Sequence, residues 1–336
     1  MIIGHEKLGS ILREIALRAG TSEFEAETMA ESVVLAELRG LSSHGVVRYP
    51  SYIERISMGL YATHVEPEIT KDAGTLFMVD GKNAIGAPLA MWTMRRCVER
   101  AAECGVCFAA VNHGNHFGIG AYYTGYAAKH GMIGFAVANA NAWVAPLGGR
   151  EKKLGTNPLS ISVPGKKDVF LLDMATSEAA QGKVVVAEKK GVQVPLGWGV
   201  DSEGKPTQDP SAILHGGALL AFGGAKGYGI CLLIEILCAA LAGGTRSNVM
   251  GSMFARDKII GTGMFMGAID VSKLVDRETF DVRVDEIYGD IRSTGALIPG
   301  EIEAGREETS REKGIDVPDP IFEDLRALAE RYGVEV

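Results

Sequence analysis

The chain carries VCFAAVNHGNHFGIGAYYTGYAAKHG at residues 106–131, and this segment alone predicts a strand, a turn and a helix. Its continuous apolar run at 106–111 predicts a buried strand, and the pattern at 121–130, followed by Gly131, predicts a helix. Between them lie His113, His116 and three glycines. A glycine-rich turn that opens into a helix presents backbone N–H groups to an anionic ligand, and histidine exchanges a proton near neutral pH.

The segments around this one predict an alternation of helices and strands. Helices are expected at 22–39, with a capping box of Ser22 and Glu25, from just after His44 to Met58, and at 87–103, 179–190 and 319–332, the last capped by Asp319. Further strands are expected at 75–79, 132–138, 159–163, 169–172 and 264–269, with a turn at 164–168. The apolar segment 229–242 is expected to be a buried core helix, and 194–217 a long surface loop.

The composition is that of an ordinary globular protein, because 46% of the 336 residues are hydrophobic and 23% are charged. The net charge of −8 and the lack of a long basic run argue against nucleic-acid binding. Segment 229–242 is too short to span a bilayer and carries Glu235, and no apolar signal segment follows Met1. We therefore expect a cytoplasmic protein that binds neither nucleic acid nor membrane.

The cysteines predict reduced thiols. There are five, an odd number, and most of them lie in apolar patterns. Cys104 and Cys107 have the spacing of a redox or zinc pair, but no second pair with ligand spacing follows. Buried thiols of a cytosolic protein account for this distribution better than disulfides do.

A second candidate site lies at Ser43-His44-Gly45, with Arg48 four residues after the histidine. Side chains at positions i and i+4 of a helix share one face. The guanidinium group of arginine binds a planar carboxylate through two parallel hydrogen bonds. The spacing alone leaves open whether Arg48 binds a ligand or pairs with a glutamate on the surface.

Two further segments place polar groups at the ends of predicted elements. Asp173 follows a predicted strand, where α/β proteins collect ligands, and its carboxylate suits ribose hydroxyls. Thr176 and Ser177 add hydroxyl groups, although a helix N-cap is an alternative role for Ser177. Lys226 lies in the glycine-rich segment 223–229 at the start of a predicted helix, which is a suitable place for an anion.

Several familiar motifs are missing. Segment 223–229 lacks the residue order of a P-loop, and 118–120 lacks the third glycine and the later acid of a Rossmann fingerprint. Neither Gly-x-Ser-x-Gly nor His-Glu-x-x-His occurs. His113 and His116 have a spacing that suits a metal, but no third ligand follows at a suitable spacing, so we expect no catalytic metal.

Taken together, these segments resemble the malate/L-lactate dehydrogenase family of the second type. The resemblance runs over nearly the whole chain and rests on SHGVVR at 43–48, HGNHFG at 113–118, KLGTNP at 153–158, DMATS at 173–177, GAKGYG at 224–229 and PGE at 299–301. The family includes L-sulfolactate and ureidoglycolate dehydrogenases, 2,3-diketo-L-gulonate reductase and a cyclic-imine reductase.

The resemblance implies an NAD(P)-dependent oxidoreductase that transfers a hydride between nicotinamide and C2 of a small 2-oxo or 2-hydroxy acid. It implies a mixed α/β fold with a large, mostly antiparallel mixed sheet flanked by helices, a non-Rossmann NAD(P)-binding fold with interleaved domains, and a homodimer. The expected division is a helical substrate and dimer region at 1–72 plus 310–336, and a discontinuous NAD(P)-binding and catalytic region at 73–309.

The resemblance also implies roles for individual residues. The proton donor and acceptor is His44 or His116, a choice that the sequence leaves open, and Arg48 holds the substrate carboxylate. The implied substrate-binding residues are Ser43, Arg48 and Tyr52. The implied contacts of NAD or NADP are His116, Gly118, Asp173, Met174, Ala175, Thr176, Lys226, Gly300 and Glu301.

Two alternatives stay open. On the same scaffold the substrate is a cyclic imine 2-carboxylate or ureidoglycolate, because Arg48 serves any of these carboxylates. In a different class, a lyase or hydrolase uses the two histidines as an acid–base pair without a cofactor. That reading leaves Lys226 and residues 300–301 without a role.

Overall fold

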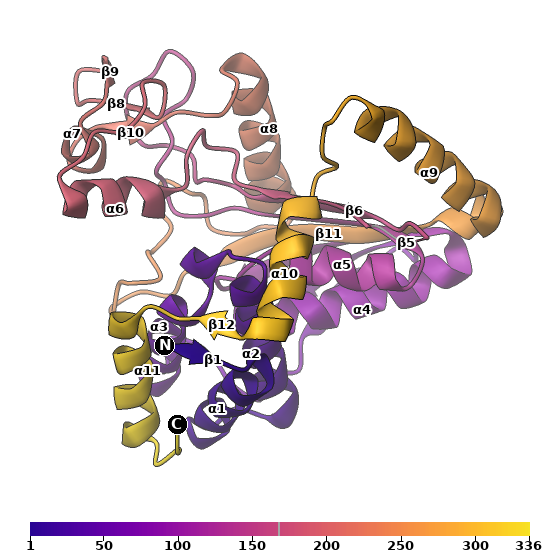
Figure 1. Cartoon of the computed structure of the whole chain (residues 1–336), viewed down its shortest axis with the longest axis horizontal. Coiled ribbons are helices and arrows are strands. Elements are labelled where there is room, and N and C mark those ends of the chain that lie inside the picture. The colour runs from indigo at the N-terminus through magenta and orange to yellow at the C-terminus, as the bar shows by residue number, and fades with distance from the viewer. Residues whose placement is uncertain (167–168) are drawn as a thin grey trace.

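A seven-stranded mixed sheet forms the centre of the molecule (Figure 1). Its strand order is β2-β3-β4-β11-β5-β6-β7, and β3 with β4 is the single parallel pair in it. The strands are β2 (Glu68–Asp72), β3 (Leu76–Asp80), β4 (Val106–Gly114), β5 (Met132–Ala138), β6 (Leu159–Val163), β7 (Phe170–Met174) and β11 (Thr262–Asp270). The expected large, mostly antiparallel mixed sheet is therefore confirmed.

The structure describes residues 1–166 and 169–336, so the turn predicted at 164–168 lies partly outside the described residues. All six predicted strands are present: β5 and β6 have the predicted bounds, and β3, β4, β7 and β11 are shifted or extended at their ends. Strand β4 extends three residues past its predicted end, to Gly114, so that His113 belongs to the strand. The central strand, β11, is buried along most of its length because both of its edges and both of its faces are covered.

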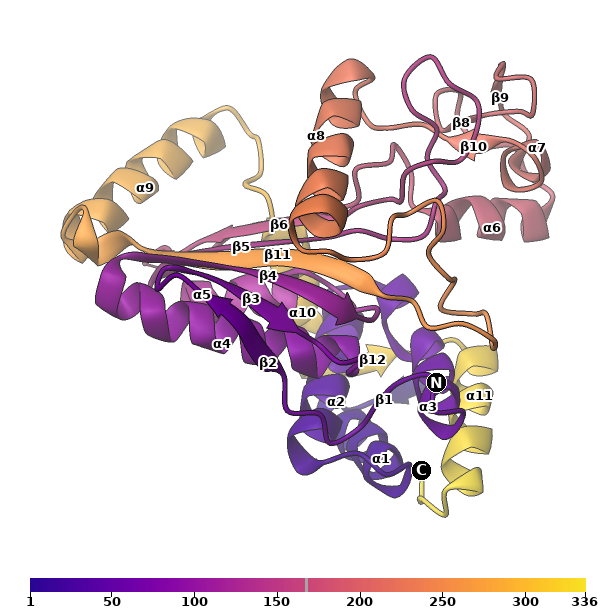
Figure 2. The same ribbon diagram turned by 180° about the vertical axis from the view of Figure 1, so that it is seen from behind.

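Helices α4 (Gly86–Cys104) and α5 (Ala121–Lys129) cover one face of this sheet (Figure 2). They share one apolar core with the sheet, in which Met91 and Met94 of α4 join Val111 of β4 and Met266 of β11. Both helices were predicted within two residues of their observed ends. Each is followed by a glycine with positive φ, Gly105 or Gly131, which is the backbone conformation expected after a helix end.

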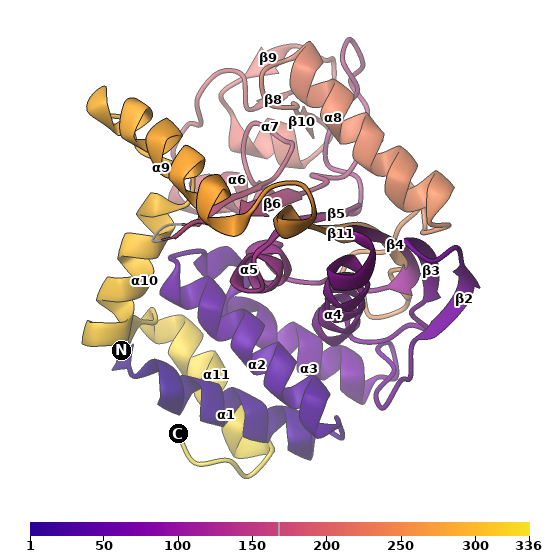
Figure 3. The ribbon, with the colours of Figure 1, turned by 90° about the vertical axis from the view of Figure 1, so that its right-hand side faces the viewer.

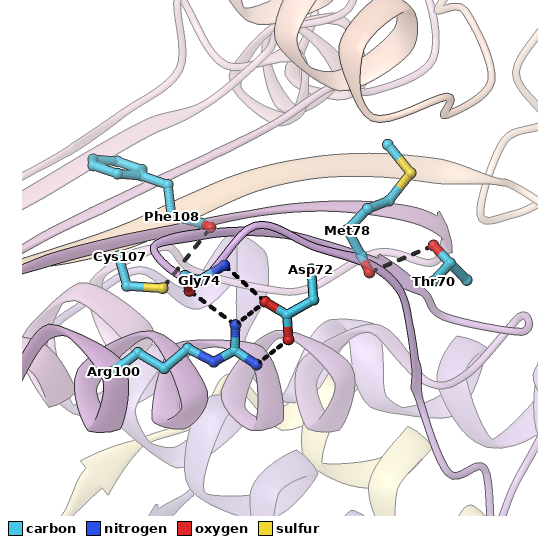
Figure 4. A network of polar contacts seen from close by, with 7 residues as sticks. All are labelled: Thr70, Asp72, Gly74, Met78, Arg100, Cys107 and Phe108. Atoms are coloured by element: carbon cyan, nitrogen blue, oxygen red, sulfur yellow. Dashed lines mark hydrogen bonds and ion pairs between the residues drawn. The ribbon is translucent and has the colours of Figure 1, made fainter. Parts of the chain in front are cut away.

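The outer edge of the sheet is tied to α4 by a polar network (Figure 4). The guanidinium group of Arg100 binds both carboxylate oxygens of Asp72 at 2.7 Å and also donates to the Gly74 carbonyl at 2.9 Å. These hydrogen bonds hold the pKa of Asp72 at about 2. The network fixes the β2–β3 hairpin against the helix that packs under the sheet.

A second layer of helices lies beyond α4 and α5. It consists of α1 (His5–Arg18), α2 (Glu23–Leu38), α3 (Tyr49–Ser57) and α11 (Asp319–Arg331), around one apolar core. The short strands β1 (Ile2–Ile3) and β12 (Ile315–Asp316) pair and bring the two ends of the chain together. The capping box of Ser22 and Glu25 is present at the start of α2, as predicted.

Two predictions for this layer need correction. The helix expected from just after His44 to Met58 is shorter: the 3-10 turns η1 (Ser42–His44) and η2 (Val46–Arg48) come first, and α3 begins only at Tyr49. Asp319 is not the cap of α11 but its first residue, after Pro318, and its carboxylate binds the amino terminus at 2.9 Å instead. For Asp319, a contact with the distant amino terminus replaces the local cap.

The segment 194–217 is not a long surface loop. It contains β8 (Gly199–Val200), β9 (Pro206–Thr207) and α7 (Pro210–Leu214), and β8 pairs with β9 and with β10 (Ala218–Leu219) in a small sheet. Together with α6 (Gln181–Lys190) these elements enclose a separate apolar core that includes Val194 and Ile213. Val194, Val200, Ile213 and Leu214 of this polar segment are buried, which its average polarity concealed, whereas Leu196 is exposed.

The apolar helix predicted at 229–242 is not fully buried. It forms α8 (Ala225–Glu235) and the π-helical segment η3 (Ile236–Leu241), of which Ile234 and Cys238 pack on Val137 of the sheet. Leu233 and Ile236 are 53% and 50% exposed. A helix that is apolar on every side buries one side here and leaves another open.

The remaining elements are α9 (Arg277–Ser293), which extends away from the sheet in Figure 3, α10 (Glu301–Lys313) and η4 (Val271–Lys273).

Within residues 1–166 and 169–336, no helix combines the length and the apolar character that crossing a membrane requires. The five cysteines form no disulfide, and all but Cys104 are buried. The predicted free thiols are therefore confirmed.

Candidate active site

The rings of His44 and His116 stack on each other, with centroids 5.6 Å apart and planes inclined by 16°. His44 ends η1, and His116 follows the end of β4. Burial is the main cause that lowers the pKa of both rings, to about 4 for His44 and well below the usual value for His116. The positive charge of Arg48 lowers both pKa values further. Both imidazoles are therefore neutral at pH 7 and able to accept a proton.

Each imidazole is held through its Nδ1 atom. The Tyr52 hydroxyl lies 2.8 Å from Nδ1 of His116, and the Ser43 hydroxyl lies 3.0 Å from Nδ1 of His44. In the described part of the chain, neither Nε2 atom makes a hydrogen bond. Because one ring nitrogen is held by a partner, the other is oriented for a ligand.

Arg48 completes this group. Its Nε atom donates to the Ser43 carbonyl at 2.7 Å, which fixes the guanidinium group beside the histidines. Burial lowers the pKa of Arg48, and among the described residues no carboxylate pairs with it. A partly buried arginine without an anionic partner is a favourable place for a carboxylate ligand, because two parallel hydrogen bonds then satisfy its remaining N–H groups.

Glu37, in the last turn of α2, fixes the backbone between His44 and Arg48. Its Oε1 atom accepts a hydrogen bond of 2.7 Å from the Val46 amide, and the side chain is buried. A Cβ atom at Gly45 would lie 2.0 Å from this oxygen. The close approach requires glycine at position 45 on grounds of space, since its φ of −88° is open to other residues.

His113 does not take part in the site. Its Nδ1 atom lies 2.8 Å from Asp80 Oδ1, and its side chain is 58% exposed. His116 contacts Tyr52 and His44 instead, so the two histidines of the sequence motif do not converge on one point. In the part of the chain that the structure describes, no three side chains of histidine, cysteine, aspartate or glutamate cluster in a way that would hold a metal ion.

A cavity of about 310 Å³ lies next to a second group of predicted residues. Asp173 and Gly300 line it, together with Arg39, Leu171 and Glu303. Gly300 has a φ of +98°, and a Cβ atom there would lie 3.0 Å from the Leu171 carbonyl oxygen and close part of the space. The Arg39 side chain is 9% exposed, and its Nε atom has no partner among the described residues. A cavity with a glycine wall and an unsatisfied N–H group suits part of a dinucleotide.

Asp173 is already engaged by the protein. Its Oδ2 atom accepts a hydrogen bond of 2.8 Å from the Ala121 amide at the start of α5. Burial raises the pKa of Asp173 to about 6, although that hydrogen bond opposes the shift. The carboxylate therefore orients the helix that follows the His116 segment, and Met174 and Ala175 continue the chain from it.

The other predicted cofactor residues are placed as follows. Thr176 is buried and donates to the carbonyls of Thr156 and Asn157, and Glu301 accepts from the Ile298 amide and pairs with Arg292. Gly118 has a φ of +79°. Lys226 lies in the exposed first turn of α8, the end of the helix that points away from the sheet in Figure 2. The structure thus brings His44, His116, Arg48, Ser43 and Tyr52 together, and leaves Lys226 apart from them.

The sequence interpretation missed some residues of the site. Glu37 lies in an ordinary helix, and Met253 and Phe254 lie in a segment without a motif, yet both of the latter contact Arg48. A signal was available for Arg55, because it follows Arg48 and Tyr52 at the helical spacing i, i+4, i+7; none pointed to Glu37, Met253 or Phe254.

Comparisons with known proteins identify the family of the chain. The chain matches the family model described as malate/L-lactate dehydrogenase over residues 3–326. It is 36% identical to a malate/(S)-sulfolactate dehydrogenase of Methanothermus fervidus, over 100% of this chain and 99% of that protein. It is 32% identical to a ureidoglycolate dehydrogenase (NAD(+)) of Escherichia coli, over 97% of this chain and 95% of that protein.

A solved structure has the same fold. The sulfolactate dehydrogenase of Methanocaldococcus jannaschii superposes with a TM-score of 0.94 at 32% sequence identity, and the alignment covers 100% of this chain and 98% of that one. The structural alignment extends over the whole chain, including α6, α7 and the small sheet of β8, β9 and β10.

Proposed function

Since the chain belongs to the malate/L-lactate dehydrogenase family of NAD(P)-dependent 2-hydroxy-acid dehydrogenases, we propose that it interconverts a small 2-oxo acid and the corresponding 2-hydroxy acid at His44, His116 and Arg48. Malate-like and lactate-like acids are the favoured substrates. Members of the family use NAD or NADP.

The observation that carries this proposal is the unpaired Arg48 beside two neutral imidazoles. Arg48 binds the carboxylate of the acid, with Nε kept on the Ser43 carbonyl and the remaining N–H groups directed to the ligand. The carboxylate compensates the charge of a partly buried guanidinium group. It also fixes C2 of the substrate next to the histidines, since C2 is bonded directly to the carboxylate carbon.

We assign the proton transfer to Nε2 of His116. When the hydroxy acid is oxidised, the neutral ring accepts the proton of the 2-hydroxyl group at Nε2, while Nδ1 keeps its hydrogen bond to Tyr52. In the reverse direction the protonated ring returns that proton to the 2-oxo oxygen. Tyr52 lies in α3 and Arg48 is the residue directly before that helix, so neighbouring parts of the chain orient both the base and the carboxylate. His44, stacked on His116, is the alternative base.

The cofactor fits residues already described. Bound nicotinamide supplies the hydride acceptor or donor for C2. Asp173 and Gly300 line the cavity of about 310 Å³. We propose that the residues next to them in the chain, Met174, Ala175, Thr176 and Glu301, and His116 and Gly118 after β4 complete the contacts of the cofactor. The glycine wall at position 300 leaves room for the ligand, and Lys226 at the start of α8 is a further proposed contact.

The test is the absorbance of reduced nicotinamide while the protein is offered NADH or NADPH with oxaloacetate, pyruvate, sulfopyruvate and piperideine-2-carboxylate, and NAD or NADP with ureidoglycolate. Oxidation or reduction with one pair fixes the substrate and the cofactor. The His116→Gln variant is expected to lose about 10²- to 10⁴-fold in kcat, because it removes the acid–base group. The Arg48→Lys variant is expected to raise KM, because lysine lacks the planar fork.

His113→Gln is the matched control, since the His113 side chain is exposed, contacts Asp80 and lies outside the site. It should keep kcat and KM. Equal losses in the His113 and His116 variants would contradict the assigned site, and no turnover with any pair would contradict the dehydrogenase proposal itself.

We also propose that the protein is a homodimer. The open side of α8 and η3 exposes Leu233 and Ile236 at 53% and 50%, and α9 exposes Ile287 at 57%. Exposed apolar side chains gathered along projecting helices favour burial against a second copy. Light scattering should give about twice the mass of one chain. Leu233→Glu should shift the protein toward the monomer, whereas a monomeric wild-type protein would contradict the proposal.

A further inference from the structure

The turn at residues 251–258 is fastened to α3 beside the proposed carboxylate site. The guanidinium group of Arg55 donates to the Ala255 carbonyl at 2.5 Å and to the Lys258 carbonyl at 2.7 Å. Its side chain is buried, and it packs over the Tyr61 ring. A buried arginine that satisfies the carbonyls of a turn holds that turn in one position, because releasing it would leave a buried charge without partners.

Helix α3 and its N-cap residue Arg48 therefore orient three parts of the site. Arg48 points to the place of the carboxylate, Tyr52 contacts His116, and Arg55, one turn further on, holds the turn at 251–258. An ion pair of 2.8 Å between Glu54 and Arg256 adds a second, outer connection. The turn is in this way positioned relative to Arg48 by the helix that begins directly after Arg48.

Two side chains of this turn touch the guanidinium group of Arg48. Met253 places Sδ at 3.6 Å from Nη1, and the centroid of the Phe254 ring lies 5.0 Å from Cζ. Met253 is 8% exposed and lies in the apolar core, whereas Phe254 is 58% exposed. An aromatic ring at this distance stabilises a guanidinium cation and excludes water from one of its faces. The ring leaves the edge of the guanidinium group to a ligand.

We propose that Phe254 is a specificity-determining residue of the substrate pocket. Its ring covers one side of Arg48, and its exposed side forms part of the wall that the substituent beyond C2 meets. The inference rests on the proposed function, since it takes Arg48 as the group that binds the carboxylate. It follows that Phe254 acts on substrate binding and on the size of the accepted substituent, and that proton transfer at His116 is unaffected.

The experiment compares Phe254→Ala, Phe254→Tyr and the wild-type enzyme with pyruvate, 2-oxobutanoate, 2-oxopentanoate and phenylpyruvate. The alanine variant should raise KM for the smallest accepted acid about three- to tenfold, which corresponds to the loss of one cation–π contact, and change kcat less than twofold. Its kcat/KM for the larger acids should rise relative to the smallest one. The tyrosine variant keeps the ring and should stay near the wild-type KM.

Ile259→Ala is the matched control, because Ile259 is 57% exposed in the same part of the chain. Its KM and kcat should remain those of the wild-type enzyme. An unchanged KM in Phe254→Ala, or the same change in Ile259→Ala, would overturn the inference. So would a loss confined to kcat, because a ring that acts on binding leaves the chemical step intact.

A binding measurement separates this inference from the proposed function. Oxalate, which offers a carboxylate next to a second oxygen-bearing carbon, is titrated calorimetrically into each variant in the presence of NADH. Weaker oxalate binding in Phe254→Ala supports the role of the ring even if no acid of the panel is turned over. Equal oxalate binding in both proteins, or none in the wild-type protein, overturns the inference whatever the activity shows.

Discussion

Gly45→Ala tests how the backbone between His44 and Arg48 is held. The three atoms nearest to an added Cβ all belong to Glu37, at 2.0, 2.4 and 2.8 Å. These distances are shorter than any contact that a real Cβ atom makes. Glu37 is also buried and hydrogen-bonded to the Val46 amide. Either the carboxylate or the 42–48 segment must therefore move when alanine replaces glycine.

The expected loss of stability has two parts: the cost of fitting the new methyl group and the cost of the hydrogen bond that it displaces. Forcing an extra carbon into a packed interior costs about 1–3 kcal/mol. Displacing the Glu37 carboxylate from the Val46 amide gives up a charge-assisted hydrogen bond of about 1.5–3 kcal/mol. We expect Gly45→Ala to lower the free energy of unfolding by about 3 kcal/mol, and to raise KM because Arg48 shifts.

The assay is a double-mutant cycle in urea, followed by tryptophan fluorescence and far-UV circular dichroism. Glu37→Ala alone should cost about 2 kcal/mol, since it leaves the Val46 amide unpaired. In that background the three clashing atoms are absent, so Gly45→Ala should add less than about 1 kcal/mol. Additive costs, or a neutral single variant, would refute the reasoning, because the clash with Glu37 would then not be the cause.

The other predictions concern single hydrogen bonds and pH. Tyr52→Phe removes the partner of His116 Nδ1 and should lower kcat/KM about tenfold, the value of one hydrogen bond of about 1.4 kcal/mol, while the affinity for oxalate stays unchanged. The pKa of His44 is about 4 in the folded protein and about 6.5 when unfolded, so the unfolded state binds more protons between these values. Stability should therefore fall as the pH is lowered from 7 to 5, by about 2 kcal/mol from this group, and His44→Gln should lose that part of the slope in urea titrations. Glu235→Ala leaves the Ser247 amide and the Asn157 side chain without their shared acceptor and should cost about 3 kcal/mol in the same assay, whereas Glu235→Gln, which keeps one acceptor oxygen, should cost less than half of that.

Much of the fold could be predicted because its signals are local. The apolar run at 106–111 and the helical pattern that ends before Gly131 specify β4 and α5 within a few residues, and the capping box of Ser22 starts α2 where it was expected. Failures occur where a local pattern has two tertiary outcomes. The apolar segment of α8 is compatible with a core helix and with a helix that is open on one side, and only the neighbours of Leu233 distinguish them.

The candidate site was predicted in part for the same reason. The residue types and spacing around His44, Arg48 and His116 mark chemistry, and the resemblance to a family gathers them into one site. Neither places His113 away from it, because the strand continues through Gly114 and turns that side chain to Asp80. A histidine pair in a motif shows that imidazoles are present, but not that they meet.

By itself, the sequence determined most of the secondary structure, the free thiols and the family, since these depend on patterns within a few residues or on motifs in order along the chain. Only the tertiary structure decided that His44 stacks on His116, that Glu37 fills the space beside Gly45, and that Phe254 covers Arg48. These contacts join residues far apart in the chain, and no local propensity encodes them. They exist because the helices and the sheet pack in one arrangement, which brings the side chains of separate elements within a few ångströms.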